Sequence, residues 1–310
     1  MGNCQNKNIS QNNRCFSRFL SPISEVEFFE QIFEKQHHLF KRPSNYNDQF
    51  FSVADFTRLL TEQKFSRYDV SVAKNGIRRS PIKELHKPSK IVNPADHAQK
   101  NREFLADFRN GYTLVFEAFE RYSKSIESIV NTLTNTFQCV THTHAFFTPA
   151  NAQGYKIHYD TDDAFILQIS GRKRWQIYEG PEYLPSGPNR YDSSVHKPGK
   201  LLQDIILEPG DMLYIPRGVM HNPNCLEDWS LHLAIGIHTI TWEDLLTEAI
   251  NSAISRNPNL RSSVPFYKRD FHENIEIYRE KFTGFLSEVS SESSFTEAAK
   301  HFNRFLTHLG

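Results

Sequence analysis

Three things are scarce in this sequence: cysteine, net charge and long apolar runs. The four cysteines, Cys4, Cys15, Cys139 and Cys225, form no CxxC pair, so we expect reduced thiols and no disulfide framework. Lys plus Arg and Asp plus Glu each number 36, so no net charge draws the chain to nucleic acid or to an anionic membrane. No apolar run approaches the roughly 20 residues that a membrane span needs. We therefore expect a soluble, cytoplasmic protein that recognises its partners locally.

The periodicity of apolar residues changes along the chain and predicts four parts. Residues 1–20 are polar and rich in asparagine, which predicts a disordered tail. Residues 21–134 predict an α/β region packed on a core at 135–240, where a period of two predicts short strands in a sandwich or barrel. Residues 241–310 return to a helical period. The strands are expected at 137–147, 155–159, 164–169, 172–178, 201–207, 211–215 and 231–237.

Local signals place further elements on both sides of the β region. An alternating stretch at 68–77 predicts a hairpin that turns at Asn75-Gly76. Thr241 is expected to cap a helix, and a further helix is expected at 278–306. The helices before the β region are expected to begin after Ser24 and at 52–60, 94–109 and 115–133.

The segment Gly154 to Asp160 and a later histidine predict a metal site. Residues two apart on a strand project to one face, so His158 and Asp160 would point inward together. His221 would be the third ligand, after a type II turn at Pro209-Gly210 and the strand that follows it. Two imidazoles and one carboxylate leave open positions on a metal, which suits Fe(II) oxygen chemistry. Zinc accepts similar ligands, so these residue types leave the metal open between iron and zinc.

A lysine next to the following turn is the expected partner of an acidic ligand. Lys173 follows the turn at Ser170-Gly171 and would point inward, where its ammonium could neutralise a dicarboxylate cosubstrate. The alternative is one more cation in a solvated turn. Arg172 and Arg174 would alternate outward, so the basic cluster is no strong signal for nucleic-acid binding.

Three stretches resemble the JmjC-type ribosomal oxygenases, a cupin-fold family of protein hydroxylases. They read FTPANAQGY, HYDTDDAFILQISGRKRWQIY and LEPGDMLYIPRGVMH, and the resemblance spans roughly residues 24–250. It implies a double-stranded β-helix (a cupin or JmjC jelly roll), an Fe(II) cofactor, 2-oxoglutarate as cosubstrate and O2. His158, Asp160 and His221 match the iron ligands, and Lys173 matches the lysine that pairs with the distal carboxylate of 2-oxoglutarate. It also implies a homodimer through the C-terminal helices.

The chain departs from the family's pattern at two places. His144 stands where the family commonly has an Asn that contacts the cosubstrate; it could donate a hydrogen bond inward, perturb cosubstrate binding or add a fourth nitrogen to the metal. The family's SLHLT reads SLHLA here, and we expect His232 and Ser230 to share a face, with one of them contacting the cosubstrate. For His142 beside His144 a structural role is favoured over a second metal site, because the sequence shows no acidic partner nearby.

We expect a mainly β fold with flanking helices, and we expect the protein to be an enzyme. We expect an Fe(II)- and 2-oxoglutarate-dependent oxygenase that hydroxylates a protein or peptide side chain, with Arg or His of a ribosomal protein as candidates. The alternatives are a tailoring hydroxylase of a precursor peptide or metabolite, a demethylase on the same scaffold, and a catalytically silent cupin that binds peptides. Residues 179–200 are expected to form an ordered but irregular lid that contributes to specificity.

Overall fold

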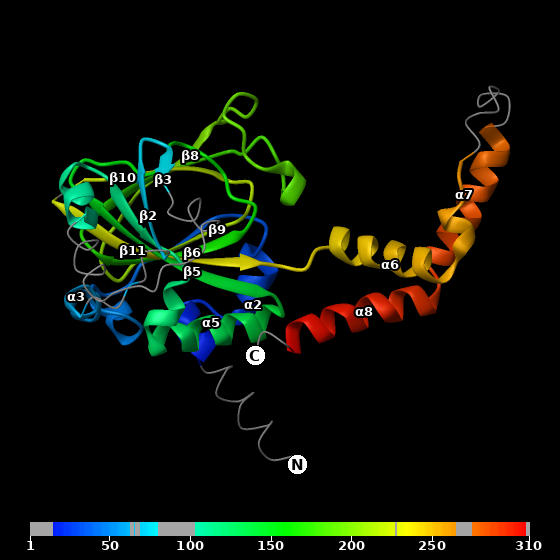
Figure 1. The fold of residues 1–310 in the computed structure, drawn as a ribbon. Helices are drawn as coiled ribbons and strands as arrows, with labels where there is room; N and C mark the ends of the chain where they lie inside the picture. The colour runs from blue at the N-terminus through cyan, green and yellow to red at the C-terminus, as the bar shows by residue number, and fades with distance from the viewer. Residues whose placement is uncertain are drawn as a thin grey trace, which may run out of the picture. The chain divides into compact units, whose positions relative to one another are not determined.

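The computed structural model describes residues 15–62, 65, 69–79, 103–226, 228–264 and 275–307. The chain divides into two compact units, one of residues 1–137 with 141–238 and one of residues 138–140 with 239–310. The first unit holds the β-sheets and the second holds the C-terminal helices (Figure 1). Of the helix expected at 94–109, only residues 103–109 lie in the described ranges, and these are helical.

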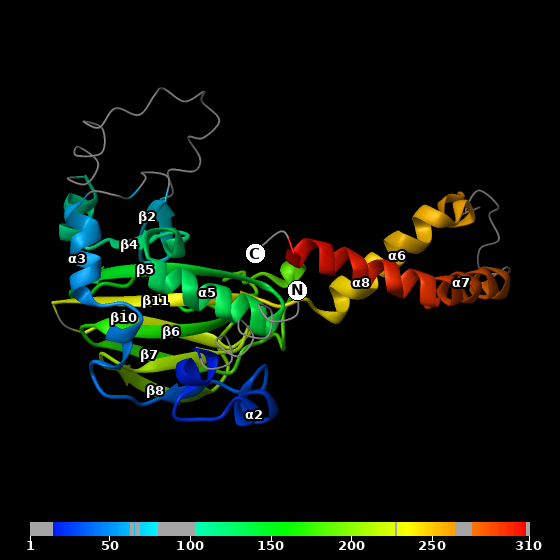
Figure 2. The same ribbon diagram turned by 90° about the horizontal axis from the view of Figure 1, so that it is seen from below.

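Two antiparallel sheets make up the first unit (Figures 1 and 2). The larger sheet has, in spatial order, β1 (His38–Phe40), β9 (Met212–Ile215), β6 (Asp163–Ser170), β11 (Trp229–His238), β5 (Val140–Pro149), β4 (Thr113–Phe116), β2 (Val70–Lys74) and β3 (Ile77–Arg79). The smaller sheet has β10 (Met220–Cys225), β7 (Lys173–Tyr178) and β8 (Leu201–Leu207). Strands from before and after residue 135 therefore share one sheet.

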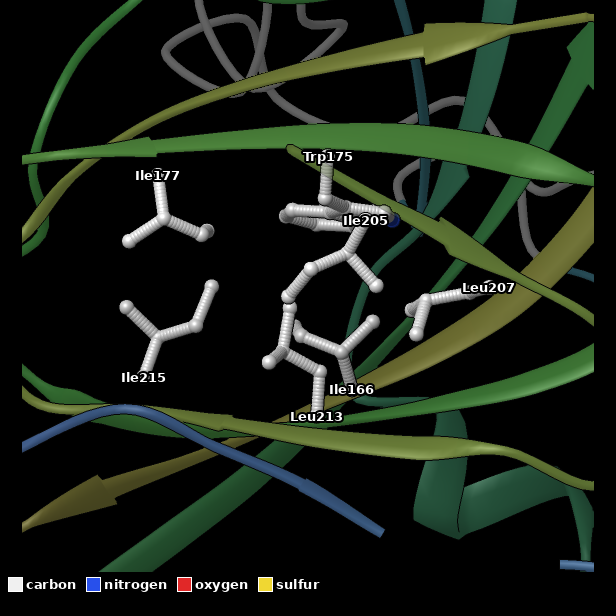
Figure 3. Close-up of a cluster of buried hydrophobic side chains, with 7 residues drawn as sticks. All are labelled: Ile166, Trp175, Ile177, Ile205, Leu207, Leu213 and Ile215. Carbon is white, nitrogen blue, oxygen red and sulfur yellow. The ribbon is translucent and has the colours of Figure 1, made fainter. Parts of the chain in front are cut away.

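The two sheets enclose an apolar core (Figure 3). Trp175 of β7 points toward Leu213 of β9, and each is at most 3% exposed. Alternation on β7 buries Lys173, Trp175 and Ile177 and leaves Arg174 in solvent, as the period of two predicts. The remaining members of this cluster are Ile166, Ile205, Leu207 and Ile215.

Short helices flank the sheets in the first unit. They are α2 (Glu25–Glu27), a π-helix at Phe28–Ile32, α3 (Val53–Thr61), α5 (Lys124–Phe137) and 3₁₀ turns at Tyr46–Gln49, Phe119–Tyr122 and Gly187–Asn189. Ser24 caps α2 by accepting from the amide of Glu27 at 3.1 Å, and Ser52 begins α3 with a capping box. The expected hairpin turn is confirmed, because Asn75 and Gly76 both have positive φ (52° and 83°) between β2 and β3.

Three expectations were wrong in their bounds. The helix expected at 115–133 begins only at Lys124, because Val115 and Phe116 belong to β4, a strand buried on both faces that shows no alternation. The strand expected at 155–159 is irregular chain that pairs only at His158. Within the tail expected at 1–20, residues 15–20 are helical, because Phe16 and Phe19 are buried in an aromatic cluster; residues 1–14 lie outside the described ranges.

The second unit is helical. It contains α6 (Trp242–Arg256), a 3₁₀ turn at Pro258–Arg261, α7 (Ile275–Val289) and α8 (Glu292–Thr307). Thr241 caps α6 as expected, in a capping box with Asp244. Its helices expose large apolar side chains, among them Trp242, Leu246, Ile277, Phe282, Leu286 and Phe295. No helix in the described part of the chain is long and apolar enough to cross a membrane.

A buried charge cluster joins the large sheet to the N-terminal region. Asp163 is fully buried, accepts from the Tyr214 hydroxyl at 2.8 Å, and pairs with Arg217, whose guanidinium also reaches Glu34 at 2.5 Å. Burial raises the pKa of Asp163, while Arg217 opposes that shift. This aspartate therefore stabilises the fold, and the contacts given for it are with Tyr214 and Arg217 and not with a ligand histidine.

Replacing Asp163 with alanine should lower the free energy of unfolding by about 3–5 kcal/mol, because Arg217 loses its buried partner. Urea unfolding followed by tryptophan fluorescence measures this change. Asp204→Ala is the matched control, since it breaks the solvent-exposed pair with Arg174 and should cost at most about 1 kcal/mol. Equal losses in the two variants would contradict the structural role of Asp163.

Candidate active site

The structure brings the three expected metal ligands together. Asp160 lies between the two imidazoles, with Oδ1 3.6 Å from Nε2 of His158 and Oδ2 3.6 Å from Nε2 of His221. All three donor atoms lie within 4.8 Å of one another, and they are the one such group of histidine, cysteine or carboxylate side chains found in the described ranges. His221 is buried, whereas Asp160 is about half exposed. A single ion would fit between them.

Backbone hydrogen bonds hold this arrangement. His158 and His221 exchange two of them, from each amide to the other's carbonyl, at 3.1 and 2.8 Å. The amide of Gly218 donates to the carbonyl of Asp160 at 3.0 Å. The expected turn before β9 is also confirmed, because Gly210 has φ +92° and the amide of Asp211 donates to Glu208 at 3.0 Å. The irregular chain at 155–160 thus takes its shape from pairing with β10.

Both ligand imidazoles have the tautomer that metal binding needs. Nδ1 of His158 lies 2.7 Å from the carbonyl of Lys156, and Nδ1 of His221 lies 3.2 Å from that of Val219. A carbonyl only accepts, so each Nδ1 carries the proton and each Nε2 presents a lone pair to an ion bound beside Asp160. Burial, together with His158, lowers the pKa of His221 to about 4 and keeps this ring neutral.

Lys173 is buried in the same cavity without an acidic partner. Its side chain is 4% exposed, and in the described ranges its Nζ forms no ion pair with a carboxylate. It donates to Thr148 Oγ1 at 3.1 Å and lies 3.4 Å from Nδ1 of His232. Burial lowers the pKa of Lys173 to about 7. A buried cation of this kind is favourable only if an anion joins it, and a ligand carboxylate fits that need.

The cavity that holds these groups measures about 360 Å³, enough for a small dicarboxylate beside a protein side chain. Trp175 forms part of its wall, with its ring centre 5.8 Å from that of His221 and 5.6 Å from that of His232. The other lining residues include Arg78, Thr113, His142, His144, Phe146, Tyr155, Asp162, Ala234 and Gly236. The metal group and Lys173 therefore open into one space.

His142 and His144 line the cavity, and each has the acidic partner that the sequence did not show. Nε2 of His144 lies 3.1 Å from Oε2 of Glu117, and Nε2 of His142 lies 3.9 Å from Oδ2 of Asp162. His144 is not in the group that could hold the ion. Burial lowers the pKa of His144, and the nearby Glu117 opposes that shift.

The structure places only one of the two residues expected on β11 at the cavity. His232 lines it with Ala234 and Gly236, whereas Ser230 is fully buried and is not among the lining residues. The pairing of β11 with β6 shifts register at His232, where the partners step from Ser170 to Gln168, so the extra residue lies in β6.

The loop 179–200 reaches the metal segment. The Tyr159 hydroxyl donates to the carbonyl of Asn189 at 2.8 Å, and the Tyr191 ring lies 6.4 Å from that of His158, centre to centre. Two residues came without a sequence signal: Arg78, which lines the cavity, and Glu117, which contacts His144. Trp175 and Thr148 could have been found, because alternation along β7 and β5 places them inward.

Comparisons with known proteins agree with this geometry. The JmjC domain model matches residues 116–245. The bifunctional lysine-specific demethylase and histidyl-hydroxylase of Branchiostoma floridae is 30% identical over 263 residues, which cover 81% of this chain and 38% of that protein. Ribosomal oxygenase 1 of Danio rerio is 28% identical over 276 residues, 84% of this chain and 48% of that protein. The chain spans less than half the length of these relatives.

Solved structures share the fold. The ribosomal oxygenase YcfD of Escherichia coli is 18% identical with a TM-score of 0.55, over 89% of this chain and 69% of that chain. Another of its structures, in complex with cobalt and 2-oxoglutarate, has the same identity and TM-score. Residues 116–245 match the JmjC domain model, and the expected cupin fold with flanking helices is confirmed. The chain as a whole is similar to the ribosomal oxygenases, as its motifs predicted.

Removing the shared carboxylate should abolish the metal site. Asp160→Ala should weaken binding of Mn(II) by more than about a hundredfold, because loss of even an outer partner of a ligand costs about 10–100-fold. Titration of the metal-free protein, followed by the paramagnetic resonance of free Mn(II), measures this affinity. Asp162→Asn, two residues on and outside the group, should bind as the wild type does; equal affinity in Asp160→Ala would refute the assignment.

Proposed function

We propose that this protein is an Fe(II)- and 2-oxoglutarate-dependent oxygenase that hydroxylates a protein or peptide side chain. The observation that carries the proposal is Lys173, a buried cation with no acidic partner in the described ranges, in the same cavity as three facing metal ligands. The ligand set alone would also suit zinc, but zinc needs no dicarboxylate beside it. The names of the relatives support the same activity.

Each residue of the site has a defined task in this proposal. His158, Asp160 and His221 hold the metal through the Nε2 atoms and the carboxylate and leave its other positions open. Lys173 binds the distal carboxylate of 2-oxoglutarate, and Trp175 covers its carbon chain. Phe146, Ile166 and Trp175 add apolar surface to the walls of this cavity. When bound, iron, 2-oxoglutarate and O2 supply the oxidation that inserts oxygen into a C–H bond and releases succinate and CO2.

For the substrate we propose a class, a protein or peptide side chain, with two candidate reactions on it. A relative is called a histidyl-hydroxylase and others ribosomal oxygenases, so Arg or His of a ribosomal protein is the first candidate. The same relative is also called a lysine-specific demethylase, which makes demethylation the second candidate. A silent peptide-binding cupin is disfavoured because the ligand group is complete. A homodimer through the C-terminal helices, whose exposed apolar side chains would suit a partner copy, stays a prediction that sedimentation of the full chain would test.

Purified protein with Fe(II), 2-oxoglutarate and O2 should release succinate, and Asp160→Ala should release none above background. Asp204→Ala, on the outer face of the small sheet, should keep the wild-type rate. With candidate peptides, a gain of one oxygen in the product mass indicates hydroxylation and a loss of one methylene indicates demethylation. Absence of succinate from metal-loaded wild-type protein, with or without peptide, would sink the proposal.

Binding of 2-oxoglutarate should weaken as pH rises above about 7. Free Lys173 loses its proton near this pH, while the bound carboxylate holds the ammonium, so binding takes up a proton. The Kd should rise about tenfold per pH unit until the pKa of the complex is passed. Calorimetry on the Mn(II)-loaded protein measures it, with pyruvate as control because it lacks the distal carboxylate. A pH-independent Kd for 2-oxoglutarate would contradict the role of Lys173.

A further inference from the structure

The cavity extends along β11, from the buried lysine toward a second polar end. Lys173 contacts His232, and Gly236, four residues further along the strand, lines the same cavity. An antiparallel strand rises by about 3.4 Å per residue, so these two positions on β11 lie about 14 Å apart. The Gly236 end, which His142 and Asp162 also line, is therefore distant from the anchor of the cosubstrate, and it is left for the substrate side chain.

At the Gly236 end, Asp162 has a carboxylate oxygen that is open to a ligand. Apart from the metal ligand Asp160, it is the one carboxylate among the described residues that line the cavity. Its Oδ1 accepts from Nδ1 of His238 at 2.7 Å, whereas its Oδ2 lies 3.9 Å from Nε2 of His142, which is too far for a hydrogen bond. Within the described ranges, no lysine or arginine pairs with this side chain, which is 27% exposed.

Gly236 makes room for the ring of His142 beside this carboxylate. A Cβ on Gly236 would lie 2.6 Å from both Cε1 and Nε2 of His142, so any larger residue here would displace the ring. His144, two residues further along β5, contacts the same ring with 5.1 Å between centres. The ring of His142 is therefore a fixed part of the cavity wall next to Oδ2 of Asp162.

The other formal charges near this end cancel each other. Arg78, which also lines the cavity, pairs with Glu117, and the same carboxylate lies 3.1 Å from Nε2 of His144. Asp162 has no such cation beside it, so it leaves a negative charge at the Gly236 end. A cationic side chain of the substrate is attracted to this charge, whereas a neutral one is not.

We infer that Asp162 is the residue that selects the substrate side chain, and that it selects the guanidinium of an arginine. The inference rests on the proposed function, in which arginine and histidine are both candidates. A guanidinium carries five N–H donors in one plane, so it can donate to Oδ2 of Asp162, pair with its charge and still direct other N–H groups elsewhere. A neutral imidazole offers a single N–H and no charge. Asp162 lies outside the group of metal ligands, so its role is confined to the substrate.

Binding of three matched peptides tests this selection. They are acetyl-Gly-Gly-X-Gly-Gly-amide with arginine, citrulline or histidine as X, where citrulline keeps the shape of arginine without its charge. The full chain loaded with Mn(II) and 2-oxoglutarate, in the absence of O2, permits no turnover, and the relaxation of the peptide protons by Mn(II) measures binding in this cavity. The Kd of the arginine peptide should be lower than those of the other two by about tenfold or more, as expected for a hydrogen bond between charged groups.

Asp162→Asn removes the charge but keeps an oxygen that can accept from His238. It should raise the Kd of the arginine peptide by about tenfold or more and leave that of the citrulline peptide unchanged. Its affinity for 2-oxoglutarate should equal that of the wild type, because Lys173 lies at the other end of the cavity. Asp204→Ala, which removes a carboxylate from the outer face of the small sheet, should bind all three peptides as the wild type does.

The inference and the proposed function fail in different ways. If the wild type binds 2-oxoglutarate but shows no preference for the arginine peptide, or if Asp162→Asn keeps that preference, the inference is overturned and the proposed function stands. Equal weakening of all three peptides by Asp162→Asn would show that Asp162 only shapes the cavity wall. Failure of the wild-type protein to bind 2-oxoglutarate at all would overturn the proposed function, and this inference with it.

Discussion

The antiparallel bridge between His158 and His221 is the constraint on which the site depends. Two backbone hydrogen bonds join these residues in an isolated bridge outside the named strands. The carbonyl of Asp160, two residues after His158, accepts from the amide of Gly218. The ligands therefore come from an irregular segment whose shape is imposed by β10 of the small sheet. Since β10 pairs with β7, the same sheet carries Lys173 and Trp175 into the cavity. One set of strand pairings thus positions the metal ligands and the cosubstrate anchor together.

Asp163 and Lys173 are both buried charged side chains of this unit, but they differ in their partners. The difference indicates that Asp163 stabilises the fold and that Lys173 binds a ligand. Asp163 is surrounded by Tyr214, Arg217 and, through the arginine, Glu34, so its charge is neutralised within the fold. Lys173 has only neutral hydrogen-bonding partners within the described chain, and burial lowers its pKa to about 7. A buried cation without an acidic partner is unfavourable for folding. Binding of a carboxylate ligand would explain why this lysine lies in the interior.

Much of the site could be predicted from sequence because its residues lie in short motifs. His158, Asp160, Lys173 and His221 were expected at one site, and the structure brings them to one cavity even though the strand assumed for 155–159 was wrong. The motif specifies their spacing whatever the backbone form. What could not be predicted came from distant pairing. Glu117 meets His144 only because β4 lies beside β5, and the register shift between β6 and β11 has no local sequence signal. Val115 and Phe116 were misassigned because a fully buried strand lacks alternation.

A crystal structure of the full chain with Mn(II) and 2-oxoglutarate under anaerobic conditions tests the central claim most directly. We expect one metal ion between Nε2 of His158, Nε2 of His221 and the carboxylate of Asp160, with the 2-oxo acid end of the cosubstrate on that ion. The distal carboxylate should lie within hydrogen-bond distance of Lys173 Nζ. A metal held instead by His142 or His144, or a cosubstrate whose distal carboxylate lies away from Lys173, would contradict it.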